Sequence, residues 1–169
     1  LPSGKDAMEM DNRGMDSEYS KKDLARGVDY IGVNCVFFCH DGAGKFLFHK
    51  RSTKCRDEHG TWDCGAGAME FGETFDDAVR REVQEEYGAE SKGIQYVGTA
   101  NVLRENTGIP THWIKNIHLV EVDPDTVRVT EPEKVDELGW FALDDLPQPL
   151  HSQIAHDVSM IREFLEKNI

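Results

Sequence analysis

The chain has 169 residues, of which 38% are hydrophobic, enough for one domain with a buried core. Its net charge of −13 argues against a surface that binds DNA or RNA, because such surfaces need clustered lysine and arginine. No apolar run approaches the roughly 20 residues of a membrane span, and no signal-peptide pattern is present. We therefore expect a cytoplasmic protein that binds neither nucleic acid nor a membrane.

Residues 1–26 are polar, mixed in charge and almost without large apolar side chains. This composition is typical of a segment outside a folded core. The chain also begins with leucine rather than methionine. We expect an N-terminal extension or tag remnant over 1–26 and a single domain over 27–169.

The first half of the domain shows strand patterns. Residues 28–39 are rich in β-branched and aromatic side chains and predict a buried strand. Residues 41–45 are a glycine-containing turn, and 46–50 return as a second strand. A polar loop over 52–60 follows.

The second half predicts two long strands, a short strand and a closing helix. The strands are expected at 94–103, 111–122 and 138–141, with a polar loop over 104–110. An apolar stripe every three or four residues predicts the helix at 154–167. Strands and helices in this order favour a mixed α/β sandwich.

Between these halves, residues 67–89 predict a glycine-containing turn and a helix. Thr74 is suited to cap the helix, with Asp77 three residues later as its capping-box partner. An apolar stripe at four-residue spacing should pack on the core. It comprises Phe75, Val79, Val83 and Tyr87.

The same helix carries an acidic face. Glu82, Glu85 and Glu86 are three and four residues apart and therefore neighbours on the helix surface. Like charges at this spacing repel, and a bound hard divalent cation would explain their grouping. Oxygen-only ligands suit Mg²⁺ or Mn²⁺ better than zinc.

The spacing of this segment resembles the signature of the Nudix (MutT-like) hydrolase superfamily. Its fixed positions are far more specific than a lone glycine motif. The matching residues are Gly67, Glu73, Arg81, Glu82, Val83, Glu85, Glu86, Gly88 and Ala89. One departure precedes the helix: residues 65–67 read Gly-Ala-Gly, where the family commonly has Pro-Gly-Gly, so we expect a somewhat more flexible turn.

The resemblance implies an α/β/α sandwich with a mixed sheet and a Mg²⁺- or Mn²⁺-dependent pyrophosphohydrolase. It implies that the metal ligands are Glu82, Glu85, Glu86 and the backbone carbonyl of Gly67. By the same resemblance, Arg81 and Glu73 orient these carboxylates. Dimers are common among such proteins, so a homodimer is a further expectation.

The resemblance leaves the catalytic base open. In some family members the base is the glutamate at the position of Glu82. In others it is an acidic residue on a later loop, here Glu133 or Glu137. The catalytic set to be tested is therefore Glu82, Glu86 and Arg81, together with Glu133 and Glu137.

Substrate choice depends on residues outside this segment. Arg51 and Arg56 lie in a loop suited to bind phosphate. Their spacing is similar to a motif of coenzyme A pyrophosphatases, although the flanking residues differ. The best expectation is a nucleoside triphosphate or another nucleoside diphosphate derivative. The alternatives are coenzyme A, ADP-ribose and, in a different class, a nucleotide-binding module without turnover.

Cysteines and histidines suggest little chemistry of their own. Cys35 and Cys39 lie on one face of a predicted core strand, where buried free thiols are the expected state. A zinc site at Cys55, His59 and Cys64 is disfavoured because the sequence has no C-x-x-C pair. We expect structural roles for His112 and His118, with the substrate cleft as the alternative.

Overall fold

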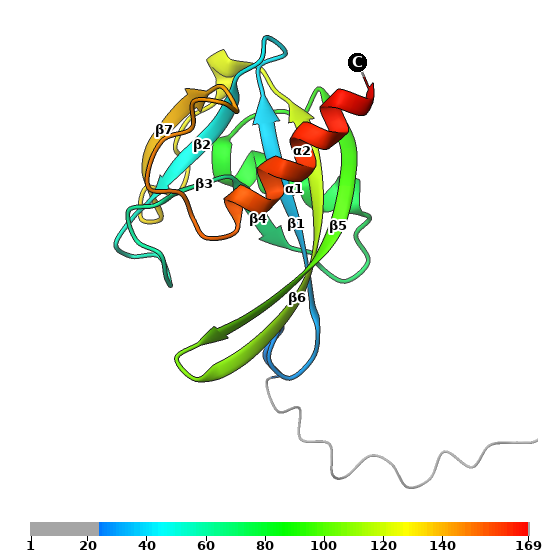
Figure 1. Ribbon diagram of the computed structural model, residues 1–169, viewed down its shortest axis with the longest axis vertical. Helices are drawn as coiled ribbons and strands as arrows, with labels where there is room; N and C mark the ends of the chain where they lie inside the picture. The colour runs from blue at the N-terminus through cyan, green and yellow to red at the C-terminus, as the bar shows by residue number, and fades with distance from the viewer. Residues whose placement is uncertain (1–23, 169) are drawn as a thin grey trace, which may run out of the picture.

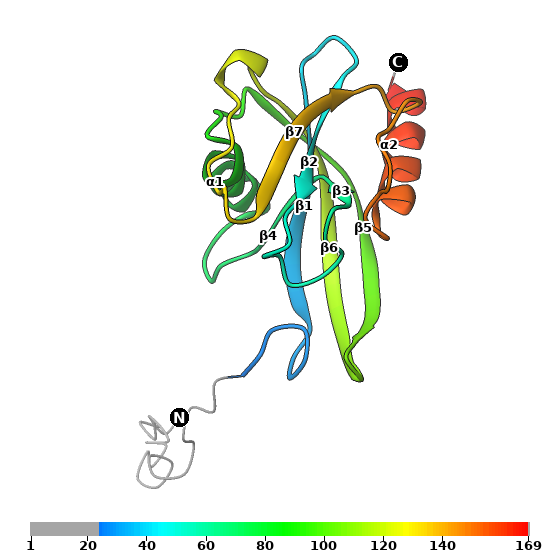
Figure 2. The same ribbon diagram turned by 90° about the vertical axis from the view of Figure 1, so that its left-hand side faces the viewer.

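The computed structural model describes residues 24–168, so most of the predicted extension lies outside the described residues and its boundary stays a prediction. Within this part, seven strands form one sheet and two α-helices cover its opposite faces (Figures 1 and 2). The strands are β1 (Gly32–His40), β2 (Phe46–Arg51), β3 (Trp62–Asp63), β4 (Gly65–Ala68), β5 (Gly93–Asn106), β6 (Ile109–Glu121) and β7 (Val135–Phe141). The helices are α1 (Phe75–Tyr87), α2 (Ile154–Asn168) and the 3₁₀ turn η1 (Pro124–Thr126).

The sheet is mixed. Its main order is β3-β2-β1-β6-β5, with β4 beside β1 and β7 beside β2. The central strands β1 and β6 are parallel, whereas the other pairs are antiparallel. The predicted α/β/α sandwich is confirmed.

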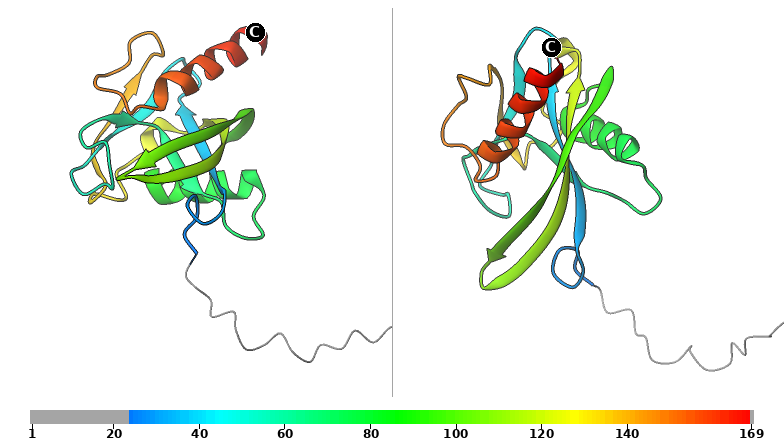
Figure 3. Two further views of the ribbon diagram at one scale, coloured as in Figure 1. Left: turned by 60° about the horizontal axis from the view of Figure 1, so that its bottom comes forward. Right: turned by 45° about the vertical axis from the view of Figure 1, so that its right-hand side comes forward.

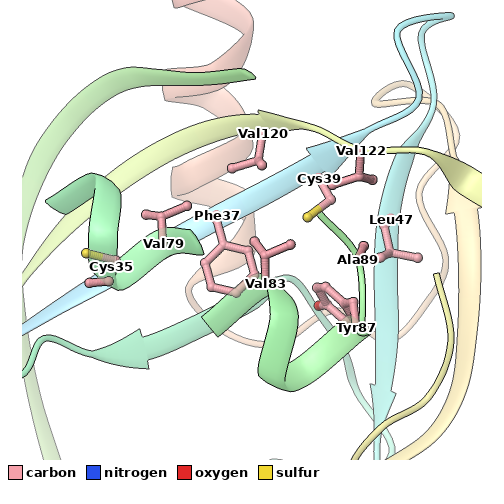
Figure 4. Packing of buried hydrophobic residues seen from close by; sticks show 11 residues of the cluster. Cys35, Phe37, Cys39, Leu47, Val79, Val83, Tyr87, Ala89, Val120 and Val122 are labelled. Atoms are coloured by element: carbon pink, nitrogen blue, oxygen red, sulfur yellow. The ribbon is translucent and has the colours of Figure 1, made fainter. Parts of the chain in front are cut away.

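Each helix buries its own apolar cluster against the sheet. The predicted cap of α1 is present, because Thr74 and Asp77 form a reciprocal capping box. Val79, Val83 and Tyr87 of α1 pack on β1, together with the free thiols of Cys35 and Cys39 (Figure 4). On the other face, the buried apolar side chains of α2 are Ile154, Val158 and Ile161, which belong to a separate cluster. The sheet is therefore the shared wall of two cores.

The first strand begins later than predicted. Residues 28–31 are not part of β1, since a turn precedes it, in which the N–H of Gly27 donates to the carbonyl of Tyr30 at 2.7 Å. Val28, Tyr30 and Ile31 are 46–50% exposed. Their β-branched and aromatic side chains mimic a strand pattern that the backbone does not follow.

The predicted loop over 104–110 is wrong. The strands β5 and β6 stay paired to Asn106 and Ile109, joined by Thr107 and Gly108. Both linking residues have positive φ, 51° and 81°, as a tight two-residue hairpin turn requires. The hairpin extends beyond the body of the domain (Figure 3). Its solvated tip carries polar side chains, which is why the sequence resembles a loop.

The turn expected over 65–67 is also wrong, because these residues belong to the strand β4. This strand pairs with β1 from Gly65 opposite Phe37 to Ala68 opposite Asn34. Ala66 does not adopt a positive φ. Replacing the family's Pro-Gly-Gly by Gly-Ala-Gly therefore places no strain on the alanine.

The described residues contain no helix that is long and apolar enough to cross a membrane.

The packing of α2 gives a first prediction. Ile161 is 0% exposed, so Ile161→Ala should lower the free energy of unfolding by about 2–5 kcal/mol through lost burial and a new cavity. Leu103 is 74% exposed, and Leu103→Ala should change it by less than about 0.5 kcal/mol. Urea denaturation of both variants tests the pair. Equal losses would mean that α2 does not pack as described.

Candidate active site

The site begins where α1 meets β4. A side chain at Gly67 would place its Cβ 1.7 Å from the carboxyl carbon of Glu82. Since atoms cannot approach so closely, only glycine allows the Glu82 carboxylate to lie against the strand. Side chains alternate along β4, so Gly67 faces α1 whereas Ala66 and Ala68 face the side of α2. The strand β4 therefore separates the acidic face of α1 from the side of the sheet that α2 covers.

Arg81 organises the carboxylates beside this contact. Its guanidinium binds Glu73 through two hydrogen bonds, Nε to Oε1 at 2.6 Å and NH2 to Oε2 at 3.0 Å. NH1 reaches Glu82 Oε1 at 2.7 Å and Glu85 Oε2 at 3.2 Å, and NH2 also donates to the carbonyl of Ala68 at 3.2 Å. The hydrogen bonds from Arg81 and from the N–H of Glu70 lower the pKa of Glu73 to about 2. Arg81 thus ties α1 to the end of β4 and to the loop that precedes the helix.

Glu86 differs from its neighbours, because one of its carboxylate oxygens is buried without a partner. Oε2 of Glu86 makes no hydrogen bond. Burial, followed by the charges of Glu82 and Glu131, raises the pKa of Glu86 well above its usual value. Burial also raises the pKa of Glu82, to which the charges of Glu85 and Glu131 contribute. The protein concentrates negative charge here and leaves one oxygen unsatisfied.

The later loop contributes a carboxylate that sequence reasoning missed. The charge of Glu131 acts on both Glu82 and Glu86, and its Oε1 pairs with Lys134 Nζ at 2.6 Å. Glu133 is exposed, and only its backbone carbonyl is held, by Ser52 Oγ at 2.5 Å. The sequence alone does not distinguish Glu131 from the other acidic residues of this loop; the tertiary fold does.

Glu137 lies on the opposite face of the sheet from the acidic face of α1. Its neighbour Leu138 packs with the core beneath α1. Since side chains alternate along β7, Glu137 points to the side of α2. It is exposed, opposite Lys50 of β2. This orientation points Glu137 away from the carboxylates of Glu82, Glu85 and Glu86 on α1.

A cleft of about 540 Å³ opens on the α2 side of β4. It runs from Ala66, Gly67 and Ala68 across β1 to β6 and the start of α2. Although the chain carries a net charge of −13, five of its 19 lysines and arginines line this cleft. They are Arg51, Arg56, Arg104, Lys115 and Lys134. Three aspartates, Asp57, Asp63 and Asp157, also line the cleft and pair with Arg51 and Lys115. The remaining excess of basic side chains beside a carboxylate cluster suits a phosphorylated ligand.

The two arginines expected to bind substrate have different surroundings. Arg51 is 17% exposed and is held by Asp63 Oδ2 at 3.1 Å and by the carboxylate and carbonyl of Asp57. Arg56 is 73% exposed and lies 4.0 Å from Asp57 Oδ2. Arg51 therefore shapes the wall of the cleft, whereas the guanidinium of Arg56 is free to meet an incoming anion.

His112, His118 and the remaining cysteines have structural surroundings. His118 is 1% exposed and donates to the carbonyl of Asn116 at 3.2 Å, and His112 bonds Asn101 at 3.0 Å. Neither histidine lines the cleft. Cys64 is buried, and Cys55 donates to the carbonyl of Lys134. Within residues 24–168, no three His, Cys, Asp or Glu side chains converge as a preformed metal cage.

The acidic cluster nevertheless fits a hard divalent ion. The unpaired Glu86 oxygen and the Glu82 carboxylate against Gly67 are oxygen donors, the type that Mg²⁺ and Mn²⁺ prefer. Burial first, and then the neighbouring carboxylates, raise the pKa values of Glu82 and Glu86, and a cation bound between them would oppose both effects.

A family model for the NUDIX domain matches residues 31–164. The chain belongs to the Nudix family. The matched range contains the sheet, α1 and most of α2.

Individual relatives agree with this membership. The chain is 33% identical over 145 residues to the NAD-capped RNA hydrolase NudC of Chromobacterium violaceum, covering 79% of this chain and 52% of that protein. It is 32% identical to the mouse 8-oxo-dGDP phosphatase NUDT18, covering 80% of this chain and 38% of the relative. The chain therefore spans about half or less of these curated relatives.

Among solved structures, a MutT NUDIX hydrolase from Burkholderia pseudomallei superposes with a TM-score of 0.68 at 31% identity. The match covers 77% of this chain and 97% of the other. The Nudix likeness thus extends through the whole sandwich and beyond the acidic helix.

The contrast between the two arginines gives a second prediction. Arg51→Met should lower the free energy of unfolding by about 1–3 kcal/mol, because the partly buried carboxylates of Asp57 and Asp63 lose their ion-pair partner. Arg56→Met should change it by less than about 0.5 kcal/mol, because the side chain is mostly exposed. Thermal unfolding of the two matched variants measures the difference. Similar stability of both would contradict the structural role of Arg51.

Proposed function

We propose that this Nudix domain hydrolyses a phosphoric anhydride bond in a nucleoside diphosphate derivative, such as a nucleoside triphosphate, with the help of Mg²⁺ or Mn²⁺. The observation that carries the proposal is the unpaired Glu86 oxygen beside Glu82, at a glycine strand that also borders a cationic cleft. A diphosphate carries charge that repels an attacking hydroxide, so its hydrolysis needs positive charge, an aligned water and a base.

The proposed metal ligands are Glu82, Glu85, Glu86 and the carbonyl of Gly67. A divalent ion held there would neutralise phosphoryl charge and lower the pKa of a bound water. Arg81, fixed by Glu73, keeps the carboxylates of α1 in place.

The other residues of the site bind substrate or move a proton. Arg56 and Lys134 line the cleft with exposed side chains and would bind the phosphates. For the base, we propose Glu131 in place of Glu133 and Glu137, because its charge acts on both Glu82 and Glu86. Glu82 is the alternative base.

The relatives do not select the leaving group or the base. The names of the two curated relatives refer to NAD-capped RNA and to 8-oxo-dGDP, which differ in both. Coenzyme A and ADP-ribose therefore stay alternatives, to be separated by a hydrolysis panel. A module that binds nucleotides without turnover is the alternative of another class, but the retained Glu82, Glu85 and Glu86 favour catalysis.

Replacing Glu86 tests the metal site. Glu86→Gln keeps the shape of the side chain and should lower kcat at least a hundredfold. Mg²⁺ should raise the melting temperature of the wild type but not that of the variant, since a ligand stabilises only the state that binds it. Without metal, the variant should be at least as stable as the wild type, because a crowded buried charge is removed.

The matched control is Glu90→Gln, an exposed carboxylate just beyond α1. It should keep both the activity and the shift with Mg²⁺. Full activity and a normal Mg²⁺ shift in Glu86→Gln would refute the metal assignment.

The choice of base is tested on the loop. Glu131→Gln should lower kcat at least tenfold with little change in KM, as expected when a proton acceptor is lost. Glu133→Gln and Glu137→Gln should stay within about twofold of the wild type. Steady-state kinetics at saturating Mg²⁺ measures all three. If kcat fell only in Glu133→Gln or only in Glu137→Gln, the substituted residue would be the base and the assignment to Glu131 would be wrong.

A further inference from the structure

Three segments that are far apart in the sequence border the cleft. They are the loop over 52–60, the strand β5 and residues 150–153, which lead into α2. Each contributes to the lining: Arg56 from the loop, Arg104 from β5 and His151 from the last segment. Cations on separate segments can bind one substrate only if the segments keep fixed positions relative to one another. A contact that fixes them would therefore act on substrate binding.

The carboxylate of Glu58 joins the three segments. Its Oε1 accepts hydrogen bonds from Arg104 NH2 at 2.6 Å and from Ser152 Oγ at 2.7 Å, and its Oε2 accepts from the N–H of Ser152 at 2.7 Å. His151 Nε2 lies 3.2 Å from the same Oε1. These contacts span 46 residues to Arg104 and 94 residues to Ser152. One side chain of the loop thus binds both β5 and the start of α2.

The backbone of Glu58 is strained. Its φ is 48°, a value that residues other than glycine rarely adopt. Such a conformation costs free energy and persists only where surrounding contacts impose it. Thr61 adds a contact on the backbone side, because its Oγ donates to the carbonyl of Glu58 at 2.7 Å. The shape of the loop therefore depends on the contacts of Glu58, and losing them would let the loop relax.

The charge of Glu58 strengthens these contacts. Burial opposes ionisation of the carboxyl group, but the hydrogen bonds from Ser152 and the charges of His151 and Arg104 outweigh it and lower the pKa of Glu58 below its usual value. The carboxylate is therefore ionised at neutral pH. Hydrogen bonds to an ionised acceptor are about twice as strong as those between neutral groups.

Two cations of the cleft depend on this carboxylate. Arg104 is 30% exposed, and its NH2 lies between Glu58 Oε1 and Asp57 Oδ2, the latter at 3.4 Å. Arg56 precedes Glu58 by two residues, so the place of its backbone follows from that of Glu58. Both guanidinium groups line the cleft, whereas Glu58 is not among the described residues that do so.

We propose that Glu58 is a positioning residue, which holds Arg56 and Arg104 where they bind the phosphates of the substrate and so determines substrate affinity. It takes no part in the chemical step. The inference rests on the proposed function, since it concerns the phosphate contacts of the same site.

Replacing Glu58 by glutamine tests the proposal. Glu58→Gln keeps the shape of the side chain, but an amide accepts hydrogen bonds at only one of its two ends, so Arg104 or Ser152 loses its acceptor. Calorimetry would measure the Kd of adenosine triphosphate whose bridging oxygens are replaced by methylene groups, in the presence of Mg²⁺. The variant should bind this analogue about tenfold more weakly than the wild type. Amide hydrogen exchange over 53–60 should become faster, because the loop relaxes.

Steady-state kinetics separates positioning from catalysis. In Glu58→Gln, KM should rise by a factor similar to that of Kd while kcat stays within twofold, because binding of the ground state and of the transition state weakens equally. A fall in kcat with unchanged KM would overturn the proposal. Unchanged affinity for the analogue would overturn it too, as would weaker binding without faster exchange, which would indicate a direct contact with the substrate. No binding of the analogue by the wild type would also overturn it.

A second variant tests the same contact from its other side. Ser152→Ala removes the hydroxyl that donates to Glu58 and should weaken binding of the analogue about threefold. Added to Glu58→Gln, it should weaken binding by less than a further twofold, because contacting residues are not additive. Full additivity of the two effects would contradict the shared contact.

Two controls complete the experiment. Glu163→Gln is the matched substitution in an exposed ion pair with Lys167 at the far end of α2, and it should leave Kd and KM unchanged. Ile161→Ala lowers stability away from the loop and should also leave the affinity of the folded domain unchanged. If Ile161→Ala weakened binding as much as Glu58→Gln, the effect of Glu58 would be one of stability alone and the proposal would be wrong.

The outcome is separable from that of the proposed function. A domain whose affinity for the analogue depends on Glu58 but which hydrolyses no nucleotide would refute the hydrolase and keep the positioning role. A domain that hydrolyses nucleotides equally well with and without Glu58→Gln would refute only the positioning role.

Discussion

The absence of a side chain at Gly67 is the constraint on which the site depends. With any Cβ at that position, the Glu82 carboxylate would have to leave the surface of β4. Arg81 would then lose the geometry that lets it bind the carbonyl of Ala68 and the carboxylate of Glu73 together. The other contacts of the acidic cluster thus depend on the close approach of α1 to β4.

The cluster is electrostatically unbalanced. Arg81 is shared among Glu73, Glu82 and Glu85, whereas the buried oxygen of Glu86 is without a hydrogen bond. A buried, unpaired carboxylate favours its neutral form, which explains the direction of its pKa shift. The same imbalance would favour binding of a divalent cation, because the ion would supply positive charge beside the unpaired carboxylate.

The local sequence was enough to predict α1, since the residues of its cap, apolar stripe and acidic face all recur at helical spacing. The sheet was predicted less completely. The β5–β6 hairpin was interrupted at 104–110 because its solvated tip is polar, and β4 was missed because glycine and alanine carry no strand pattern. The effect of Glu131 on Glu86 could not be predicted from the sequence, since it depends on where an acidic loop folds back. The roles of the predicted site residues themselves stay predictions.

The two faces of β4 divide the work of the proposed site. Gly67 admits carboxylates from α1 on one face, and the small side chains of Ala66 and Ala68 leave the other face open to the cleft. A nucleotide lying in the cleft would bring its phosphates to this thin strand, with cations on one side and carboxylates on the other. Larger residues here would close the cleft or displace the helix. In the proposed site, the Gly-Ala-Gly sequence would therefore keep the carboxylates and the cleft on separate faces of β4, yet both within reach of one substrate.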